Sequence, residues 1–148
     1  MTTRLAQAEE SCVRRGTRLT DIRRLVLSLI FAHRGPVGAY ALLDGLRAER
    51  ANAAPVTIYR ALEFLQANGL IHRIERLNAF VACTDQGEHL DHDHGVQFLI
   101  CRTCKTVVEM EDRGINRAVS RAAGQSGFRP DHATIEVEGT CEACASAS

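Results

Sequence analysis

The residues best suited to chemistry in this 148-residue chain are cysteines arranged in two Cys-x-x-Cys pairs. The first pair is Cys101 and Cys104, and the second is Cys141 and Cys144. A Cys-x-x-Cys turn brings two sulfurs close enough to share one ion, and two such turns complete the tetrahedral four-thiolate site that zinc favours. A redox dithiol or a pair of disulfides is the alternative, but one redox motif does not explain two pairs. The spacing therefore predicts a structural zinc site.

A second group of metal-binding residue types is spread more widely along the sequence. Its members are His72, Cys83, His94 and Glu109. Each also has an ordinary interpretation, as a surface residue or, for Cys83, as a small buried apolar residue. One ion held by all four would join the two halves of the chain at a fixed angle, so this group is the candidate regulatory site. Other donors could replace His94 or form a weaker site: His89, Asp91, His92, Asp93 and His132.

Charge separates the chain into the same two halves. Residues 1–82 hold 12 arginines and 7 acidic residues, whereas residues 83–148 hold 6 basic and 11 acidic residues. The first half is therefore suited to face a polyanion and the second to hold cations. No apolar run approaches the roughly 18 residues that cross a bilayer, and residues 1–10 do not resemble a secretory signal. We expect a cytoplasmic protein whose cysteines bind metal.

Helical periodicity dominates the first half. Apolar residues three and four apart predict four helices: residues 3–14, a segment capped by Thr20 and ended by Gly35, residues 39–49 and residues 56–68. The third helix is expected to bury Tyr40 with its leucines, and the fourth to turn Ile58, Leu62 and Leu65 inward. Two strands, 70–75 and 79–83, follow with a turn at 77–78. Helices followed by a hairpin indicate a winged helix-turn-helix.

The second half predicts a small α/β domain. Its expected elements are strands at 96–101, 106–110 and 133–139 and a helix at 114–126. About 60 residues make a marginal core, so metal, dimerisation or both should supplement it. The predicted fold is α+β, with an N-terminal winged helix-turn-helix DNA-binding domain (1–83), a hinge (84–95) and a small C-terminal α/β zinc-binding dimerisation domain (96–148).

Taken together, these motifs resemble the ferric uptake regulator family of bacterial metal-dependent repressors. Residues 18–23 are similar to the family's Arg-Leu-Thr-x-x-Arg entry into its second helix, and residues 57–62 to its Thr-x-Tyr-Arg-x-Leu recognition helix. The doubled Cys-x-x-Cys looks like the family's structural zinc site. The zinc uptake regulator branch fits best, because His72 and Cys83 match its regulatory ligands and His94 and Glu109 have its spacing. The resemblance implies two zinc ions per chain, one structural and one regulatory.

The resemblance also implies a function and the residues that carry it. It indicates a homodimeric repressor that binds palindromic double-stranded operator DNA of zinc-uptake genes when zinc is bound, with one or two dimers per operator. Arginine can pair with guanine and tyrosine can contact a thymine methyl group or a phosphate. The implied DNA-contact residues are Thr57, Tyr59 and Arg60 on the recognition helix, with Arg18 and Arg23 at the backbone or an adjacent minor groove.

Departures from the family pattern and rival functions also follow from the sequence. Asp21 replaces the usual proline, and Asn116 stands where iron-type members often carry a carboxylate ligand, which makes a third metal site doubtful. A sister sensor of iron, manganese or peroxide is one alternative, although thiolate and imidazole donors favour zinc. A zinc hydrolase would need an open coordination position and a general acid or base. No His-Glu-x-x-His motif accompanies the cluster, so we expect no enzyme. DNA binding without zinc dependence is a further alternative.

Overall fold

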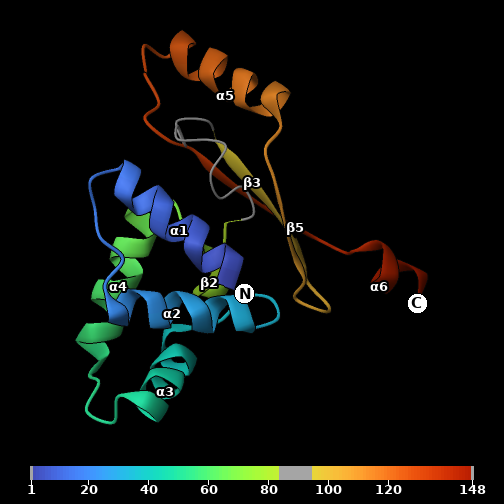
Figure 1. The fold of residues 1–148 in the computed structure, drawn as a ribbon. Coiled ribbons are helices and arrows are strands. Elements are labelled where there is room, and N and C mark those ends of the chain that lie inside the picture. The colour runs from blue at the N-terminus through green and yellow to red at the C-terminus, as the bar shows by residue number, and fades with distance from the viewer. Residues whose placement is uncertain (1, 84–94, 148) are drawn as a thin grey trace. The chain divides into compact units, whose positions relative to one another are not determined.

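The computed structural model describes residues 2–83 and 95–147, and the chain divides into two compact units, Met1–His89 and Leu90–Ser148. The first unit contains α1 (Thr2–Arg14), α2 (Asp21–Ala32), α3 (Ala39–Glu49), α4 (Pro55–Ala67), β1 (Ile71–Ile74), the 3-10 turn η1 (Glu75–Leu77) and β2 (Ala79–Ala82). The second contains β3 (Val96–Cys101), β4 (Val107–Met110), α5 (Arg113–Gln125), β5 (Thr134–Gly139) and α6 (Glu142–Ser146) (Figure 1). The predicted hinge lies outside the described residues except for Gly95. None of the helices in the described ranges is long and apolar enough to cross a membrane.

The helices of the first unit begin where the sequence predicts. The Thr20 side chain caps α2 by accepting a hydrogen bond from the Arg23 amide, and Pro55 occupies the first turn of α4, where its missing N–H costs nothing. Ile58, Leu62 and Leu65 of α4 are buried, as predicted. The expectation for Tyr40 is wrong, because this residue is 73% exposed. It stands in the first turn of α3, and its exposure shows that the core that covers the leucines of this helix does not cover its side chain.

The core of the first unit joins all four helices to the hairpin. Its fully buried members include Leu27, Leu46, Leu65 and Ile71. The hairpin is attached to the segment before α3 by a two-way backbone pairing: the Val37 amide donates to the Phe80 carbonyl at 3.0 Å, and the Phe80 amide donates back at 2.8 Å. The predicted winged helix-turn-helix is therefore confirmed, with its wing bonded to the helical core.

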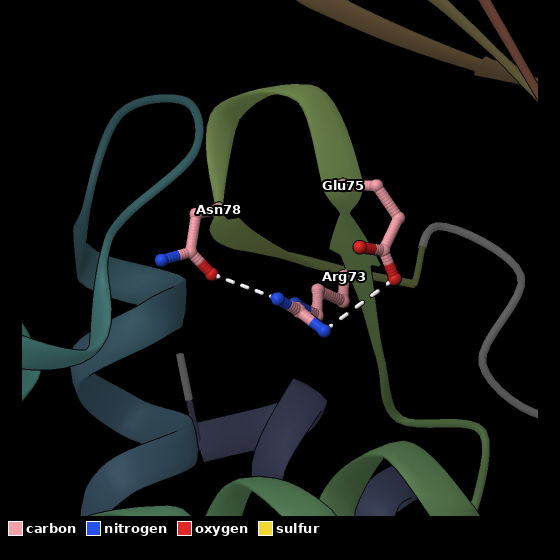
Figure 2. A network of polar contacts seen from close by, with 3 residues as sticks. All are labelled: Arg73, Glu75 and Asn78. Atoms are coloured by element: carbon pink, nitrogen blue, oxygen red, sulfur yellow. Dashed lines mark hydrogen bonds and ion pairs between the residues drawn. The ribbon is translucent and has the colours of Figure 1, made fainter.

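The tip of the wing is built by an arginine clamp (Figure 2). β1 and β2 pair antiparallel with Arg73 opposite Phe80, and η1 takes the place of the short predicted turn. Arg73 donates from Nη2 to Asn78 Oδ1 at 3.0 Å and from Nη1 to Glu75 Oε1 at 3.4 Å. Asn78 has a left-handed backbone (φ 46°), a conformation that asparagine tolerates better than most residues. The clamp and the left-handed residue together close the hairpin.

The second unit contains a three-stranded sheet in the order β4-β3-β5. β3 pairs antiparallel with β4 and parallel with β5, and α5 belongs to the connection that returns the chain to the parallel strand. All four predicted elements of this half are present within one residue of their expected limits. α6 is an additional short helix that sequence periodicity did not indicate, since five residues are too few to show a helical repeat.

The left-handed turn generates a stability prediction. We expect Asn78→Val to lower the free energy of unfolding by about 1–2 kcal/mol, because a β-branched side chain is strained at positive φ and cannot accept from Arg73. Asn78→Gly should cost less than about 1 kcal/mol, because it loses only the exposed hydrogen bond. Urea unfolding of both variants with zinc present measures the difference. Equal losses in the two variants would contradict the backbone explanation.

Candidate metal centres and nucleic-acid interface

The four predicted structural cysteines come together in the second unit. Cys101, Cys104, Cys141 and Cys144 place their sulfur atoms within 4.8 Å of one another, and Cys104 Sγ lies 3.8 Å from Cys141 Sγ. A tetrahedral ion with bonds of about 2.3 Å holds its sulfurs about 3.8 Å apart. All six cysteines are free thiols, and a disulfide would need sulfurs about 2.05 Å apart. The donor set and its spacing therefore fit zinc.

The sheet explains why two distant pairs meet. Cys101 is the last residue of β3 and lies opposite Gly139, the last residue of the parallel strand β5. The Arg102 amide extends this ladder by donating to the Gly139 carbonyl at 2.8 Å. Cys141 then follows two residues after β5 and forms the N-cap of α6, which carries Cys144. Parallel pairing thus brings both turns to the same end of the sheet.

The first cysteine turn is shaped to hold negative charge. Backbone N–H groups, first that of Cys104 and then that of Cys141, lower the pKa of Cys101 to about 5. The Thr106 hydroxyl, with Oγ1 3.0 Å from Cys104 Sγ, lowers the pKa of that thiol as well. The neighbouring sulfurs, Cys141 first, raise the pKa of Cys144 to about 12. The cluster therefore favours the thiolate form at Cys101 and the protonated form at Cys144.

Two of the predicted regulatory ligands are adjacent on the wing. His72 lies opposite Val81 in the β1–β2 ladder, and the Cys83 amide donates to the Leu70 carbonyl at 3.0 Å, which places Cys83 on the same face as His72. Their ligand atoms lie within 4.8 Å of each other. Cys83 is 1% exposed and His72 is half-buried. An imidazole and a thiolate at this separation make half of a zinc coordination sphere.

The other predicted donors occupy several places. Glu109 is half-buried on β4 of the second unit, where it lies opposite Phe98. His132 is exposed, two residues before β5. The remaining predicted donors lie outside the described residues: His89, Asp91, His92, Asp93 and His94.

The predicted recognition helix presents its polar motif to solvent. Tyr59 is 51% exposed and Arg60 is exposed, because the burial of Ile58, Ala61 and Leu62 turns the intervening positions outward. Within the described part of the chain, Arg60 has no hydrogen-bond or ion-pair partner. Thr57 is half-buried in the first turn of α4. A free guanidinium beside an exposed phenol can serve as a contact surface for nucleic acid.

Arg18 and Arg23 differ in their surroundings. Arg18 is exposed in the loop before α2. Arg23 lies with its guanidinium 3.6 Å above the Phe64 ring and donates from Nη1 to the Arg18 carbonyl at 2.8 Å. Its cation–π contact thus fixes the loop that carries Arg18 against α4. Sequence periodicity did not reveal this role, because Phe64 follows Arg23 by 41 residues and the pairing exists only in the folded unit.

These features coincide with a family-level match. The ferric uptake regulator family model matches residues 14–138. The chain belongs to the ferric uptake regulator family. The match spans the motifs at residues 18–23 and 57–62, on which the predicted resemblance rested, and it includes Cys101 and Cys104, whereas Cys141 and Cys144 follow residue 138.

Similar proteins place the chain within the family. The zinc uptake regulation protein of Escherichia coli (strain K12) is 39% identical over 142 residues, which cover 95% of this chain and 80% of that protein. A zinc uptake regulator complexed with zinc and DNA is 38% identical, with a TM-score of 0.89 over 97% of this chain and 93% of that one. A second solved structure, the crystal structure of holo XcZur, has 44% sequence identity to this chain and a TM-score of 0.88, and the match covers 99% of both chains.

The thiol pKa values of this family member generate a prediction about protons. Zinc should displace the proton of Cys144, whose pKa of about 12 keeps it protonated at neutral pH, so affinity should rise with pH. Cys101, with a pKa of about 5, is already a thiolate and should release no proton above about pH 6. Proton release on zinc addition, measured calorimetrically in buffers of different ionisation enthalpy, tests this. A zinc affinity that does not rise with pH, or zinc binding that releases no proton at neutral pH, would contradict the assignment.

Proposed function

We propose that the chain is a zinc-responsive transcriptional repressor that binds palindromic operator DNA of zinc-uptake genes as a homodimer in the cytoplasm. The observation that carries this proposal is the combination of a closed four-cysteine cluster in one unit with a His–Cys pair on the wing of a DNA-binding unit. Its similarity to zinc uptake regulators over nearly its whole length supports zinc as the effector.

The four-cysteine cluster binds the structural zinc. All four ligands belong to the second unit, so this ion stabilises that unit by itself. It joins the end of β3 to the chain beyond β5 and thereby anchors α6. Structural zinc contributes about 10–16 kcal/mol in small zinc-finger peptides, far more than a unit of this size gains from its own core.

The regulatory zinc is bound by His72, Cys83, His94 and Glu109, which gives two zinc ions per chain. The wing supplies His72 and Cys83, and the second unit supplies Glu109. Because these ligands come from both units, the ion restricts the angle between them to one that fits the operator. A hundredfold gain in DNA affinity requires about 2.7 kcal/mol of coupling, and DNA then tightens zinc binding by the same factor.

The helix α4 enters the major groove, with Tyr59 and Arg60 directed at bases and phosphates. Thr57, Arg18 and Arg23 contribute contacts to the backbone or an adjacent minor groove, with Arg23 also orienting the loop of Arg18. The exposed Val56, one helical turn before Arg60 on α4, adds an apolar group to this surface. The first unit carries the positive charge that such a contact requires.

The second unit forms the dimer. Leu99 lies opposite Val108 on β4 and opposite Val137 on β5, and these three side chains are 38%, 51% and 47% exposed. A contiguous apolar row across a sheet marks a protein contact. When two copies pair through this row, their two α4 helices face DNA half-sites related by twofold symmetry. An operator whose half-sites repeat then binds two dimers.

The rival functions fit less well. Other sensors of the family share the fold, but the thiolate and imidazole donors on the wing favour zinc over iron or manganese. The family consists of DNA-binding regulators, and the chain is one of these rather than a zinc hydrolase. Measuring DNA binding after a chelator has removed the zinc tests whether the binding depends on zinc.

The DNA-binding proposal is tested by selecting duplexes from a random pool at one fixed salt concentration and several buffered zinc concentrations. We expect a palindromic sequence to be enriched only above a threshold of free zinc. Arg60→Ala should then lose about 1–3 kcal/mol of preference for that sequence, because it removes a base contact. Bound zinc should not change.

Arg129→Ala is the matched control, since it removes an exposed arginine of the second unit. Enrichment that is independent of zinc would overturn the proposed effector role. Unchanged sequence preference in Arg60→Ala would remove this residue from base recognition.

The two metal sites should respond differently to loss of one thiolate. Cys101→Ser should destabilise the second unit broadly, because a serine oxygen is a poor zinc ligand in a closed site. Cys83→Ser should leave a folded dimer that binds operator weakly, because it loses only the coupling between units. Thermal melts, zinc per chain and operator affinity measure both variants. A Cys83→Ser protein that melts as early as Cys101→Ser would make Cys83 structural, and one that still binds operator at ordinary zinc would make it a packing residue.

A further inference from the structure

The second unit contains a buried amide with three hydrogen-bond partners, two of them backbone groups and one a side chain. Gln97 on β3 is 1% exposed. Its Nε2 donates to Asn116 Oδ1 at 2.8 Å and to the Gly95 carbonyl at 3.3 Å, while its Oε1 accepts from the Asp112 amide at 2.9 Å. A buried amide that is fully hydrogen-bonded rigidifies its surroundings, whereas an unsatisfied one is costly. Gln97 therefore has a specific partner set that an apolar residue could not reproduce.

The partners of Gln97 lie where the chain leaves β4 and begins α5. Asp112 is the N-cap of α5, and its Oδ1 accepts from the Ile115 amide at 3.0 Å. The Asn116 amide donates to the Asp112 carbonyl at 3.1 Å, so Asn116 and Asp112 are already joined within the first turn of the helix. By contacting both, Gln97 fastens this turn to the sheet.

The backbone at Gly95 is packed closely against the same group. A Cβ atom at this position would lie 2.8 Å from Asn116 Oδ1 and 3.3 Å from the Ala133 carbonyl. The Val96 amide also donates to that carbonyl at 3.2 Å, which ties the start of β3 to the residue before β5. The network therefore fixes the first residues of β3 as well as the end of β4.

Glu109 stands beside this network on β4. The β3–β4 ladder places Gln97 opposite Met110 and Phe98 opposite Glu109. The bond from the Asp112 amide to Gln97 continues the attachment of β4 two residues beyond its last ladder pair. The strand that carries Glu109 is thus held at its C-terminal end by the Gln97 side chain.

The Gln97–Asn116 pair in this network carries no charge. Gln97 and Asn116 are both amides, and their donor and acceptor satisfy one another. A carboxylate in either place would bring a buried negative charge that attracts a cation. The amide pair holds the helix to the sheet with hydrogen bonds alone.

We propose that Gln97 is a positioning residue for the regulatory zinc, which fixes the end of β4 and so orients Glu109 without touching the ion. This inference rests on the proposed role of Glu109 as a ligand. Groups that orient a metal ligand typically affect affinity by about 10- to 100-fold when removed. The loss of the Gln97 hydrogen bonds should therefore weaken the regulatory site while the four-cysteine site keeps its zinc.

The test compares three variants of the full chain with structural zinc in place. Gln97→Leu removes all three hydrogen bonds at similar volume, and Gln97→Glu keeps the acceptor for Asp112 while losing the donor to Asn116. Val107→Ala is the matched control, since it loosens β4 through a half-buried residue opposite Ile100 and outside the network. The regulatory affinity is measured by competition with a chromophoric chelator, and cobalt substitution reports the ligand geometry through its visible absorption bands.

We expect Gln97→Leu to weaken the regulatory site about 10- to 100-fold and to alter the cobalt bands. Gln97→Glu should weaken it at least as much, because its carboxylate faces the Asn116 and Gly95 oxygens that accept from the amide. Val107→Ala should change the affinity of the regulatory site for zinc less than about threefold, although its melting temperature should be comparable to that of the Gln97 variants. Should Gln97→Leu fail to fold, Gln97→Glu carries the same comparison. Wild-type affinity in the folded Gln97 variants, or equal weakening in Val107→Ala, would overturn the positioning role.

Glu109→Ala separates this inference from the function on which it rests. If Glu109→Ala weakens the regulatory site and the Gln97 variants do not, only the positioning role fails. If Glu109→Ala leaves the affinity unchanged, Glu109 is not a ligand, and both the proposed ligand set and the inference about Gln97 are overturned.

Discussion

The meeting of four cysteine sulfurs at one place is the constraint on which the second unit depends. Thirty-six residues separate the two cysteine pairs, and only the parallel pairing of β3 with β5 brings both to one end of the sheet. β4 carries the chain back to the end of the sheet where β3 begins, and the connection that contains α5 starts β5 at that end, so β5 runs parallel to β3 toward the cysteines. An ion at that position stabilises the strand order, the turn after β3 and the start of α6 together.

The first unit depends on a different constraint, which is the burial of one face of α4. Ile58, Leu62 and Leu65 fill the core, so the helical period forces Tyr59 and Arg60 outward. The stacking of Arg23 on Phe64 then ties the loop of Arg18 to the same helix. A rigid helix that presents a phenol and a guanidinium is the part of this fold suited to read DNA.

The two proposed zinc sites would serve different purposes because their proposed ligands are distributed differently along the chain. A closed thiolate set within one unit has no open coordination position and contributes folding energy. A set shared between two units contributes coupling, which needs only a few kcal/mol to change operator occupancy substantially. The neutral Gln97–Asn116 pair fits this division, since it gives the second unit an internal attachment that does not depend on a metal ion.

Local pattern alone determined much of this protein. The helices of the first unit, the cysteine pairs and the wing hairpin follow from apolar period, caps and ligand spacing, all of which act over a few residues. The family resemblance of residues 18–23 and 57–62 followed from the same short motifs.

Tertiary structure decided the rest. Tyr40 is exposed although its helix buries leucines, because the direction of a first-turn side chain depends on what packs against the helix. Gln97 looked like an ordinary polar residue in a strand, and its role appears only when Gly95, Asp112 and Asn116 surround it. Likewise, the facing of Cys83 and His72 depends on hairpin register. Such pairings join residues far apart in the chain, and no local period specifies them.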